Sequence, residues 1–324
     1  MMMEERTYKR NATATVKILV IAVALIACTM YFISLKGKPA VSDLKLEASS
    51  AILIDLQTGK VIYEKNANEP LPPASMSKLM TELLVLDMAN EGELGWSERI
   101  TTSSYAAEVP GSQIGFGAGE SYTVRELFEA MAVHSANDAA VALAEHIAGS
   151  EAAFTVLMNN RAEKLGLSSQ TVFANATGLS AEDLLPFEEA SNQRDTVMTA
   201  KDTALLAGYL LKKYPEVLEV SSRSSVKLAS TSQKLQTTNL MLNGMPYAFP
   251  GNDGLKTGYT PQAGYCFTGT AKQADRRLVS VIMGARTPEQ RFTETSLLFD
   301  YGFQTDGLES LIGHIQSKLG IQVG

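Results

Sequence analysis

The sequence predicts an α/β (α+β) fold, in which an antiparallel sheet is flanked by helices and an all-helical lobe is inserted between its strands. Strand-like runs stand near both ends of the folded region, around residues 50–63 and 255–283, and helical periodicity fills the interval. A compact domain must bring these distant strands into one sheet, so the helical middle should form a lobe of its own.

The first elements form a hairpin and a helix. Apolar runs at 50–56 and 60–63 flank Gln57-Thr58-Gly59, which has the composition of a tight turn. After Pro72-Pro73, apolar residues recur at helical intervals of three and four. We therefore expect a helix to begin near Ser75.

The helical middle carries clear start and stop signals. Thr123 and Glu126 form a capping box that opens a helix to His134. Further helices are expected over 138–148 and 151–165, the second ended by Gly166, and from Thr199 to about Lys213. Strand-like segments then return at 255–260, 266–271 and 278–283, and Thr287-Pro288 begins a closing helix.

Composition excludes several classes of protein. The 324-residue chain is 45% hydrophobic and 19% charged, which is typical of globular domains, and its net charge of −7 argues against nucleic acid as a partner. Cys28 lies in an apolar run, so a structural disulfide to Cys266 is not expected. No zinc-peptidase motif occurs, and we expect neither a metal ion nor another cofactor.

The N-terminal region predicts a membrane anchor. Residues 18–35 contain 18 consecutive uncharged residues, or roughly 27 Å of helix, close to the thickness of a bilayer core. Basic residues precede the run in a tail at 1–17, which favours a cytoplasmic N-terminus. This places the rest of the chain on the far side of the membrane, with a spacer at 36–47, a folded domain at 48–305 and a short tail at 306–324.

Two alternatives to an uncleaved anchor stay open. A cleaved signal peptide would have a shorter apolar core and small residues before the cut, and no clear site of that kind stands near Leu35. Leu25-Ile26-Ala27-Cys28 is similar to a lipoprotein processing box, but the residues after Cys28 continue as an apolar run.

The chemistry is indicated by a serine and a lysine three residues apart. The pattern Ser-x-x-Lys occurs at 42–45, 75–78 and 224–227, and only the middle copy opens an apolar run with helical spacing. On a helix, residues three apart share a face, so the Lys78 amine can approach the Ser75 hydroxyl. Ser75 is therefore the predicted nucleophile.

A lysine can act as the general base only if it is neutral. Lowering its pKa by about three units costs roughly 4 kcal/mol, and a second cation about 4 Å away can supply that by repulsion. Lys256, in Lys256-Thr257-Gly258, is the candidate for the second cation. The dipole at the start of the Ser75 helix would also favour developing negative charge.

Four ordered segments carry a resemblance to a known family. Residues 72–80 (PPASMSKLM), 134–140 (HSANDAA), 175–179 (NATGL) and 253–260 (DGLKTGYT) resemble the low-molecular-mass penicillin-binding proteins, the serine-type D-alanyl-D-alanine carboxypeptidases. The resemblance covers roughly residues 48–303. It implies a β-lactamase/transpeptidase-like fold and an enzyme that removes the terminal D-alanine from peptidoglycan stem pentapeptides.

The resemblance also implies roles for individual residues. Ser75 would be acylated by the stem peptide or by a β-lactam antibiotic, with Lys78 as general base and Ser135 relaying a proton to the leaving D-alanine. Asn137 would bind the peptide amide. Lys256 and Thr257, next to Gly258, would receive the terminal carboxylate, and the backbone N–H groups of Ser75 and Tyr259 would form the oxyanion hole.

The sequence departs from this family in two places. Relatives carry an arginine after a Thr-Asn pair, whereas this chain has Leu240 after Thr238-Asn239, so one cation near the substrate carboxylate is missing. Arg291 matches a second family arginine and is expected to bind that carboxylate. Many relatives also have a β-rich domain and an amphipathic helix after the catalytic domain, and here the N-terminal span would take over the anchoring.

Two other functions are compatible with the same motifs. A class A-like β-lactamase would need a glutamate positioned for deacylation, and the residues around Glu188 and Glu189 lack the expected pattern. A catalytically inactive cell-wall-binding protein on the same fold is contradicted by the intact motif residues. The sequence does not separate hydrolysis from transfer to a second amine.

Overall fold

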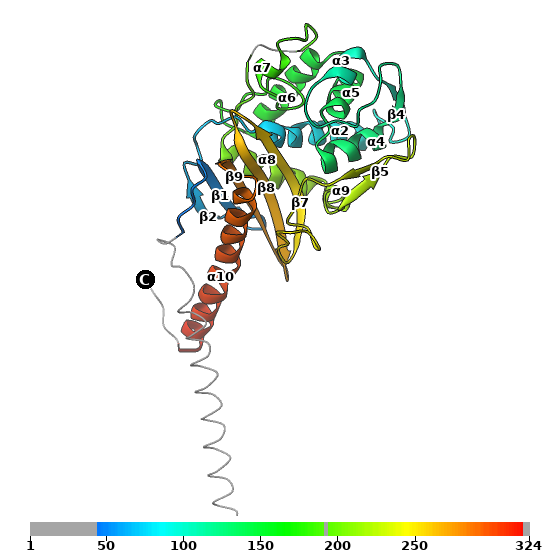
Figure 1. Ribbon diagram of the computed structural model, residues 1–324. Helices are drawn as coiled ribbons and strands as arrows, with labels where there is room; N and C mark the ends of the chain where they lie inside the picture. Colours follow the sequence, from blue (N-terminus) through cyan, green and yellow to red (C-terminus); the bar gives the residue numbers. More distant parts are fainter. Residues whose placement is uncertain (1–43, 191–193, 320–324) are drawn as a thin grey trace, which may run out of the picture. The chain divides into compact units, whose positions relative to one another are not determined.

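A five-stranded antiparallel sheet organises the domain, with the strand order β2-β1-β9-β8-β7 (Figure 1). Its strands are β1 (Ser50–Asp55), β2 (Val61–Lys65), β7 (Asn252–Thr260), β8 (Gly264–Gln273) and β9 (Arg276–Ala285). The N-terminal hairpin pairs directly with the last strand, β9. The prediction that the two ends of the domain share one sheet is therefore confirmed.

The computed structural model describes residues 44–190 and 194–319, with side chains described to residue 304. Contacts divide the chain into a segment up to Lys45 and a compact unit that begins at Leu46. The predicted tail at 1–17 and membrane helix at 18–35 lie outside the described residues, as does most of the spacer.

Helices cover both faces of the sheet. Helix α10 (Gln290–Leu319) packs on β8 and β9, and α8 (Ala200–Lys213) packs on β1 and β9. A side chain at Gly302 of α10 would meet Leu53, whereas one at Gly208 of α8 would meet Ile54 and Leu56. Because neighbouring residues of a strand point to opposite faces, the two helices lie on opposite sides of β1.

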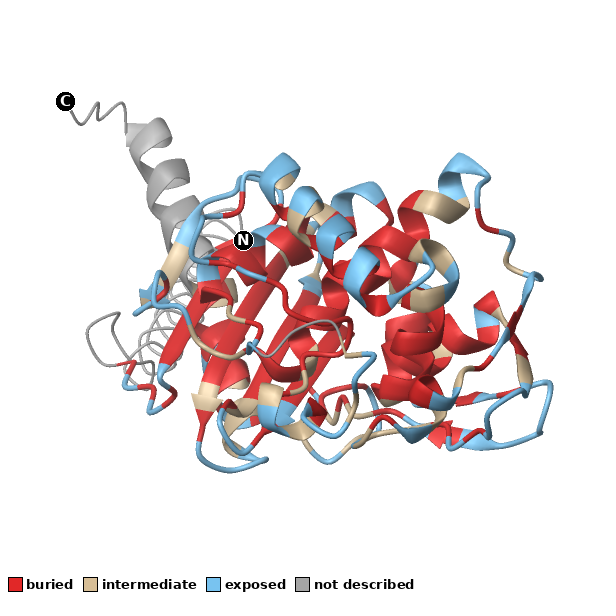
Figure 2. Ribbon diagram, turned by 90° about the horizontal axis from the view of Figure 1, so that it is seen from above, coloured by how far each residue is buried: buried red, intermediate tan, exposed pale blue. Residues whose placement is uncertain are grey.

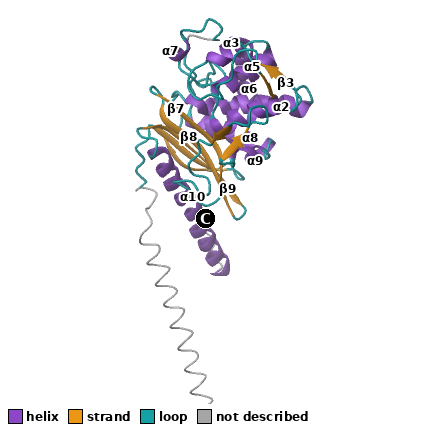
Figure 3. Ribbon diagram, turned by 45° about the vertical axis from the view of Figure 1, so that its right-hand side comes forward, coloured by secondary structure: helices purple, strands orange, loops and turns teal. Residues whose placement is uncertain are grey.

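The lobe between β2 and β7 is mainly helical, as predicted (Figure 3). Its central helices are largely buried (Figure 2). Its helical elements are η2 (Ala74–Ser77), α2 (Lys78–Glu91), α3 (Ser104–Glu108), α4 (Val124–Glu129), η3 (Ala130–His134), α5 (Asn137–Ala148), α6 (Glu151–Leu165), α7 (Ala181–Leu184) and α9 (Val217–Ser221).

Two short ribbons were not predicted from the sequence. Strand β3 (Arg99–Thr101) pairs with β4 (Ser121–Thr123), and β5 (Ser225–Lys227) pairs with β6 (Lys234–Gln236). Strands of three residues are too short to show an alternating pattern. In the Ser-x-x-Lys copy at 224–227, Ser224 precedes β5 and Lys227 ends it, so the two residues are not a helical pair.

Other boundaries differ from the predicted ones. The helix opened by the Thr123 and Glu126 capping box keeps that box, but after Glu129 it continues as a π-helical turn to His134. The closing helix begins at Gln290 and runs to Leu319, so the boundary expected at residue 305 falls inside it.

The described helices differ in length or apolar character from a membrane-spanning helix. Within 44–190 and 194–319, no single helix has both the length and the apolar character of a membrane span. The pair α5 and α6, bent by 84°, meets the requirement of length and composition when taken together.

Apolar side chains of α10 that are buried against the rest of the domain should contribute to its stability. Phe299 is fully buried and its ring centroid lies 5.2 Å from that of Phe249. Phe299→Ala is expected to lower the free energy of unfolding by about 3–5 kcal/mol, because it leaves a cavity under the helix. Leu297→Ala, at a 45% exposed position of the same helix, should change it by less than about 1 kcal/mol in chemical denaturation. Equal losses of stability in the two variants would contradict the buried position of Phe299.

Candidate active site

Ser75 lies in the tight turn that leads into α2. It belongs to the 3-10 helix η2, and Lys78 is the first residue of α2, so the pair spans a junction between two helix types. The Ser75 Oγ and Lys78 Nζ atoms are hydrogen-bonded at 2.7 Å. The Ser75 and Lys78 side chains are in contact, as predicted, although a 3-10 turn rather than an α-helix brings them together.

The Lys78 amine has three hydrogen-bond partners. Besides Ser75 Oγ, it donates to Asn137 Oδ1 at 2.6 Å and to the Thr177 carbonyl at 2.8 Å. The last two groups can only accept. A neutral amine has two N–H bonds and one lone pair, so those two acceptors leave the lone pair for the Ser75 O–H. The arrangement can therefore take a proton from Ser75.

Burial favours the neutral form of that amine. Lys78 is completely buried, and burial followed by repulsion from Lys256 lowers the pKa of its amine well below the usual range. Burial also lowers the pKa of Lys256, to about 8, with a further lowering by Arg291. The two lysines therefore interact as the sequence suggested, but desolvation is the larger cause.

Asn137 is fixed at the start of α5. Its Nδ2 donates to the Pro110 carbonyl at 2.6 Å, which directs its Oδ1 to Lys78. Its own N–H donates to the Ser112 carbonyl at 2.7 Å. A side chain at Gly111 would come within 2.7 Å of Asn137 Nδ2, so this close approach requires glycine.

Ser135 immediately follows the π-helical turn. Its φ of 67° is in the left-handed region, which is unfavourable for a residue other than glycine or asparagine. The conformation lies between η3 and α5, where the chain changes direction before Asn137. Backbone strain of this kind is common at functional sites. It leaves Ser135 in the wall of the same cavity as Ser75.

A turn at 175–179 supplies the third partner of Lys78. Asn175 Oδ1 accepts from the backbone N–H of Thr177 at 3.1 Å and of Gly178 at 2.6 Å. Gly178 has a φ of 79°, and a Cβ there would lie 2.0 Å from the Ala74 carbonyl oxygen. The turn therefore packs directly against the Ser75 segment. The sequence showed this segment only as part of a resemblance, without its contact with Lys78.

Strand β7 forms the opposite wall. A Cβ at Gly258 would lie 2.6 Å from the Pro73 carbonyl and 3.1 Å from the Ser75 backbone nitrogen. The glycine thus lets β7 approach the nucleophile turn closely. Tyr259 follows, half exposed, with its ring stacked on Tyr265 at a centroid distance of 4.3 Å.

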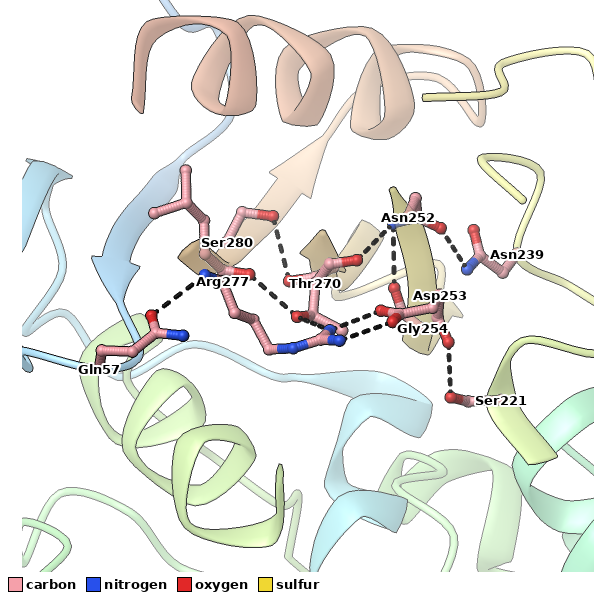
Figure 4. Close-up of polar contacts among 11 residues, drawn as sticks. Gln57, Ser221, Asn239, Asn252, Asp253, Gly254, Thr270, Arg277 and Ser280 are labelled. Carbon is pink, nitrogen blue, oxygen red and sulfur yellow. Dashed lines mark hydrogen bonds and ion pairs between the residues drawn. The ribbon is translucent and has the colours of Figure 1, made fainter. Parts of the chain in front are cut away.

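A polar network holds β7 from behind (Figure 4). Arg277 on β9 makes a bidentate contact with Asp253 at 2.6 and 2.7 Å, and Ser221 Oγ donates to the Asp253 carbonyl. Asn239 Nδ2 donates to Asn252 Oδ1 at 3.0 Å. These bonds fix the start of β7 to β9, to α9 and to the loop that carries Thr238.

That loop also contacts the site itself. Thr257 Oγ1 lies 2.6 Å from Thr238 Oγ1, and both threonines line the cavity. The sequence did not predict Thr238 as a site residue, because there it stands out only as part of the Thr-Asn pair that precedes Leu240. Leu240 is not among the lining residues.

Arg291 comes from the first turn of α10. It donates to the Gly258 carbonyl at 3.2 Å, and its guanidinium lies 5.4 Å from the Tyr265 ring centroid and 4.8 Å from that of Phe292. Its Nε is buried without a hydrogen-bond partner among the described residues. The guanidinium is therefore held at the cavity by aromatic rings.

The cavity has a volume of about 300 Å³. It is lined by Ser75, Gly111, Ser112, Ser135, Asn137, Gly178, Leu179, Thr238, Thr257, Gly258, Tyr259, Thr260 and Arg291. All but two of the predicted site residues belong to this lining. Lys78 and Lys256 lie behind it, fully buried, so neither amine is exposed in the cavity wall.

A serine beside a buried lysine amine, in a cavity between a sheet and a helical lobe, defines the class of serine acyl-transfer proteins that use a lysine base. A family model described as D-alanyl-D-alanine carboxypeptidase, peptidase family S11, matches residues 37–287. The chain belongs to this family. The resemblance seen in the sequence is thus confirmed.

Individual relatives agree with that membership. D-alanyl-D-alanine carboxypeptidase DacF of Bacillus subtilis is 40% identical over 265 residues, covering 81% of this chain and 64% of DacF. DacC of Escherichia coli is 33% identical, with 80% and 62% covered. The chain thus spans somewhat less than two thirds of the length of these relatives.

Solved structures share the fold. Penicillin-binding protein D2 of Listeria monocytogenes, in an ampicillin-bound form, is 38% identical, with 81% of this chain and 99% of that chain covered and a TM-score of 0.69. Penicillin-binding protein 3 of Streptococcus pneumoniae is 38% identical, with 79% and 73% covered and a TM-score of 0.75. The predicted β-lactamase/transpeptidase-like fold is confirmed.

Close packing at Gly258 provides a test of the site geometry. Gly258→Ala should lower the free energy of unfolding by about 1–3 kcal/mol, because the new methyl group collides with the backbone of the Ser75 turn. Gly95→Ala is the matched control, since its Cβ would meet nothing closer than 3.6 Å. Chemical denaturation measures both; an unchanged stability for Gly258→Ala would contradict the close approach of β7.

Proposed function

We propose that this chain is a serine-type D-alanyl-D-alanine carboxypeptidase that removes the terminal D-alanine from peptidoglycan stem pentapeptides. The observation that carries the proposal is the contact of Ser75 with a buried Lys78 amine whose two N–H bonds are taken by Asn137 and Thr177. Family membership supplies the substrate class.

Acylation would begin with proton transfer from Ser75 to Lys78. The Ser75 oxygen attacks the carbonyl carbon of the penultimate D-alanine, and the backbone N–H groups of Ser75 and Tyr259 stabilise the oxyanion. Ser135, in the wall of the same cavity, passes a proton to the leaving nitrogen. Free D-alanine departs, and water then hydrolyses the ester on Ser75.

Recognition of the terminal carboxylate would fall to groups in the cavity wall. Thr257 and Thr238 offer two hydroxyl groups, and Arg291 supplies a cation close to Gly258. Lys256 adds positive charge from behind the wall. This set compensates for the arginine that Leu240 replaces. Asn137 Oδ1 already accepts from Lys78, and its second lone pair would accept from the substrate amide.

β-Lactams would acylate the same serine, as the ampicillin-bound relative supports. A β-lactamase would need a carboxylate to activate water for rapid deacylation. The described residues that line the cavity include no glutamate, and Glu188 and Glu189 are exposed. We therefore expect a long-lived penicilloyl enzyme rather than rapid turnover.

Labelling with a fluorescent penicillin tests the nucleophile. Ser75→Ala should abolish covalent labelling, and it should stop D-alanine release from a stem pentapeptide, because no other group can form the ester. Ser77→Ala is the control, since the Ser77 hydroxyl is buried without a hydrogen-bond partner among the described residues. Equal labelling of wild type and Ser75→Ala would refute the assignment. Penicillin turnover without D-alanine release would instead favour the β-lactamase function.

The proposal places the catalytic domain outside the cytoplasmic membrane, held by a helix at residues 18–35. Its support is the length and apolar character of that segment and the extracytoplasmic location of peptidoglycan. A chain lacking residues 1–36 should move from the membrane fraction to the soluble fraction and keep its penicillin labelling. A mature N-terminus found near Cys28 or Lys38 in the full-length protein would contradict the uncleaved anchor.

A further inference from the structure

A buried carboxyl group stands next to the two catalytic-site lysines. Glu82 lies on α2, four residues after Lys78, and is only 3% exposed. Residues four apart lie on the same face of a helix, so Glu82 follows Lys78 on the side of α2 that faces the site. Carboxyl groups are seldom buried unless a cation accompanies them.

The second lysine reaches the same layer from the sheet. Lys256 on β7 pairs with Thr268 on β8, and cross-strand partners project to the same face. Thr268 Oγ1 lies 3.1 Å from Met76 Sδ, within the turn that precedes α2. Lys256 therefore points into the space between the sheet and the beginning of α2, where Lys78 and Glu82 also lie.

We propose that Glu82 is the buried counter-ion of Lys256. Its carboxylate keeps the Lys256 amine protonated while Lys78 stays neutral. The inference rests on the proposed function. In this arrangement Lys78 is neutral, Lys256 carries one positive charge and Glu82 one negative charge, so the buried trio has no net charge. Removing the carboxylate would leave the Lys256 charge uncompensated in the interior.

The other charged groups around Lys78, Lys256 and Glu82 either have hydrogen-bond partners of their own or lower the pKa of Lys256. Asp138, which faces Lys78 from α5, accepts from the N–H groups of Gly115 and Ala139. Glu151, on α6, accepts from the Tyr105 hydroxyl and the Ala176 N–H. Arg291 lowers the pKa of Lys256. Lys256 Nζ donates to the Thr257 carbonyl at 3.2 Å, and of the two charged groups that act on Lys256, Glu82 is the one that favours its charge.

The electrostatics agree with this geometry. Burial raises the pKa of Glu82 to about 7, an effect that Lys256 and then Lys78 oppose. Glu82 in turn raises the pKa of Lys256 against the effect of burial. The Glu82 carboxyl group thus ionises at a higher pH than an exposed one, so its charge matters most in the alkaline range.

The pH dependence of acylation tests the inference. The second-order rate of labelling by a fluorescent penicillin, measured from about pH 5 to about pH 10, should give a bell whose alkaline limb reports Lys256. In Glu82→Gln that limb should move to lower pH by about one unit, with an approximately tenfold lower rate in the alkaline range. The acid limb should move less, because Glu82 is already protonated there.

Three further variants separate charge from packing. Glu82→Asp keeps the carboxylate and should keep the wild-type limb, whereas Glu82→Met, a neutral side chain of similar size, should reproduce the shift if the amide variant does not fold. Asp202→Asn alters a buried carboxyl remote from the site, bonded to Ser168 and Thr171, and should lower the melting temperature without moving the limb.

The possible failures are distinguishable. If wild type is not labelled, the proposed function fails. If wild type is labelled and the alkaline limbs of Glu82→Gln and Glu82→Met coincide with that of wild type, the role of Glu82 as counter-ion is refuted, whatever the melting temperatures. A shift in Glu82→Asp equal to that in Glu82→Gln would also refute it.

Discussion

The rest of the site depends on the burial of one lysine amine. Lys78 is removed from water and yet fully hydrogen-bonded, because Asn137 and Thr177 accept its two N–H bonds and Ser75 faces its lone pair. Desolvation lowers the pKa of the amine and so favours its neutral form, and the two acceptors orient it. Position and burial thus give this amine the properties that the proposed general base requires, without a histidine.

Such a site requires chain segments that are distant in sequence to meet at van der Waals distance. The Ser75 turn is packed by Gly178 on one side and by Gly258 on the other, and at both positions a methyl group would overlap a backbone carbonyl. Polar bonds behind the strand, from Arg277 to Asp253 and from Asn239 to Asn252, set the position of β7. The stability of the fold and the geometry of the reaction therefore share the same contacts.

Charge in the site is organised in two layers. Arg291, Thr257 and Thr238 line the cavity, where a substrate carboxylate can reach them. Lys256 and Glu82 lie behind them, in a region of low dielectric where each charge strongly affects the others. The cavity wall thus contains one cationic side chain, Arg291, although Leu240 stands where relatives carry an arginine.

The amino-acid sequence by itself determined the sheet and helix elements, the choice of Ser75 among its three Ser-x-x-Lys copies, and the family, because local periodicity and short motifs carry that information. The sequence did not predict the short ribbons β3–β4 and β5–β6, because strands of three residues have no measurable period. Only the tertiary structure decided that Thr177 completes the Lys78 contacts, that Lys256 lies behind the cavity wall, and that Thr238 lines the cavity. Those facts depend on distances between segments far apart in the chain, which no local pattern encodes.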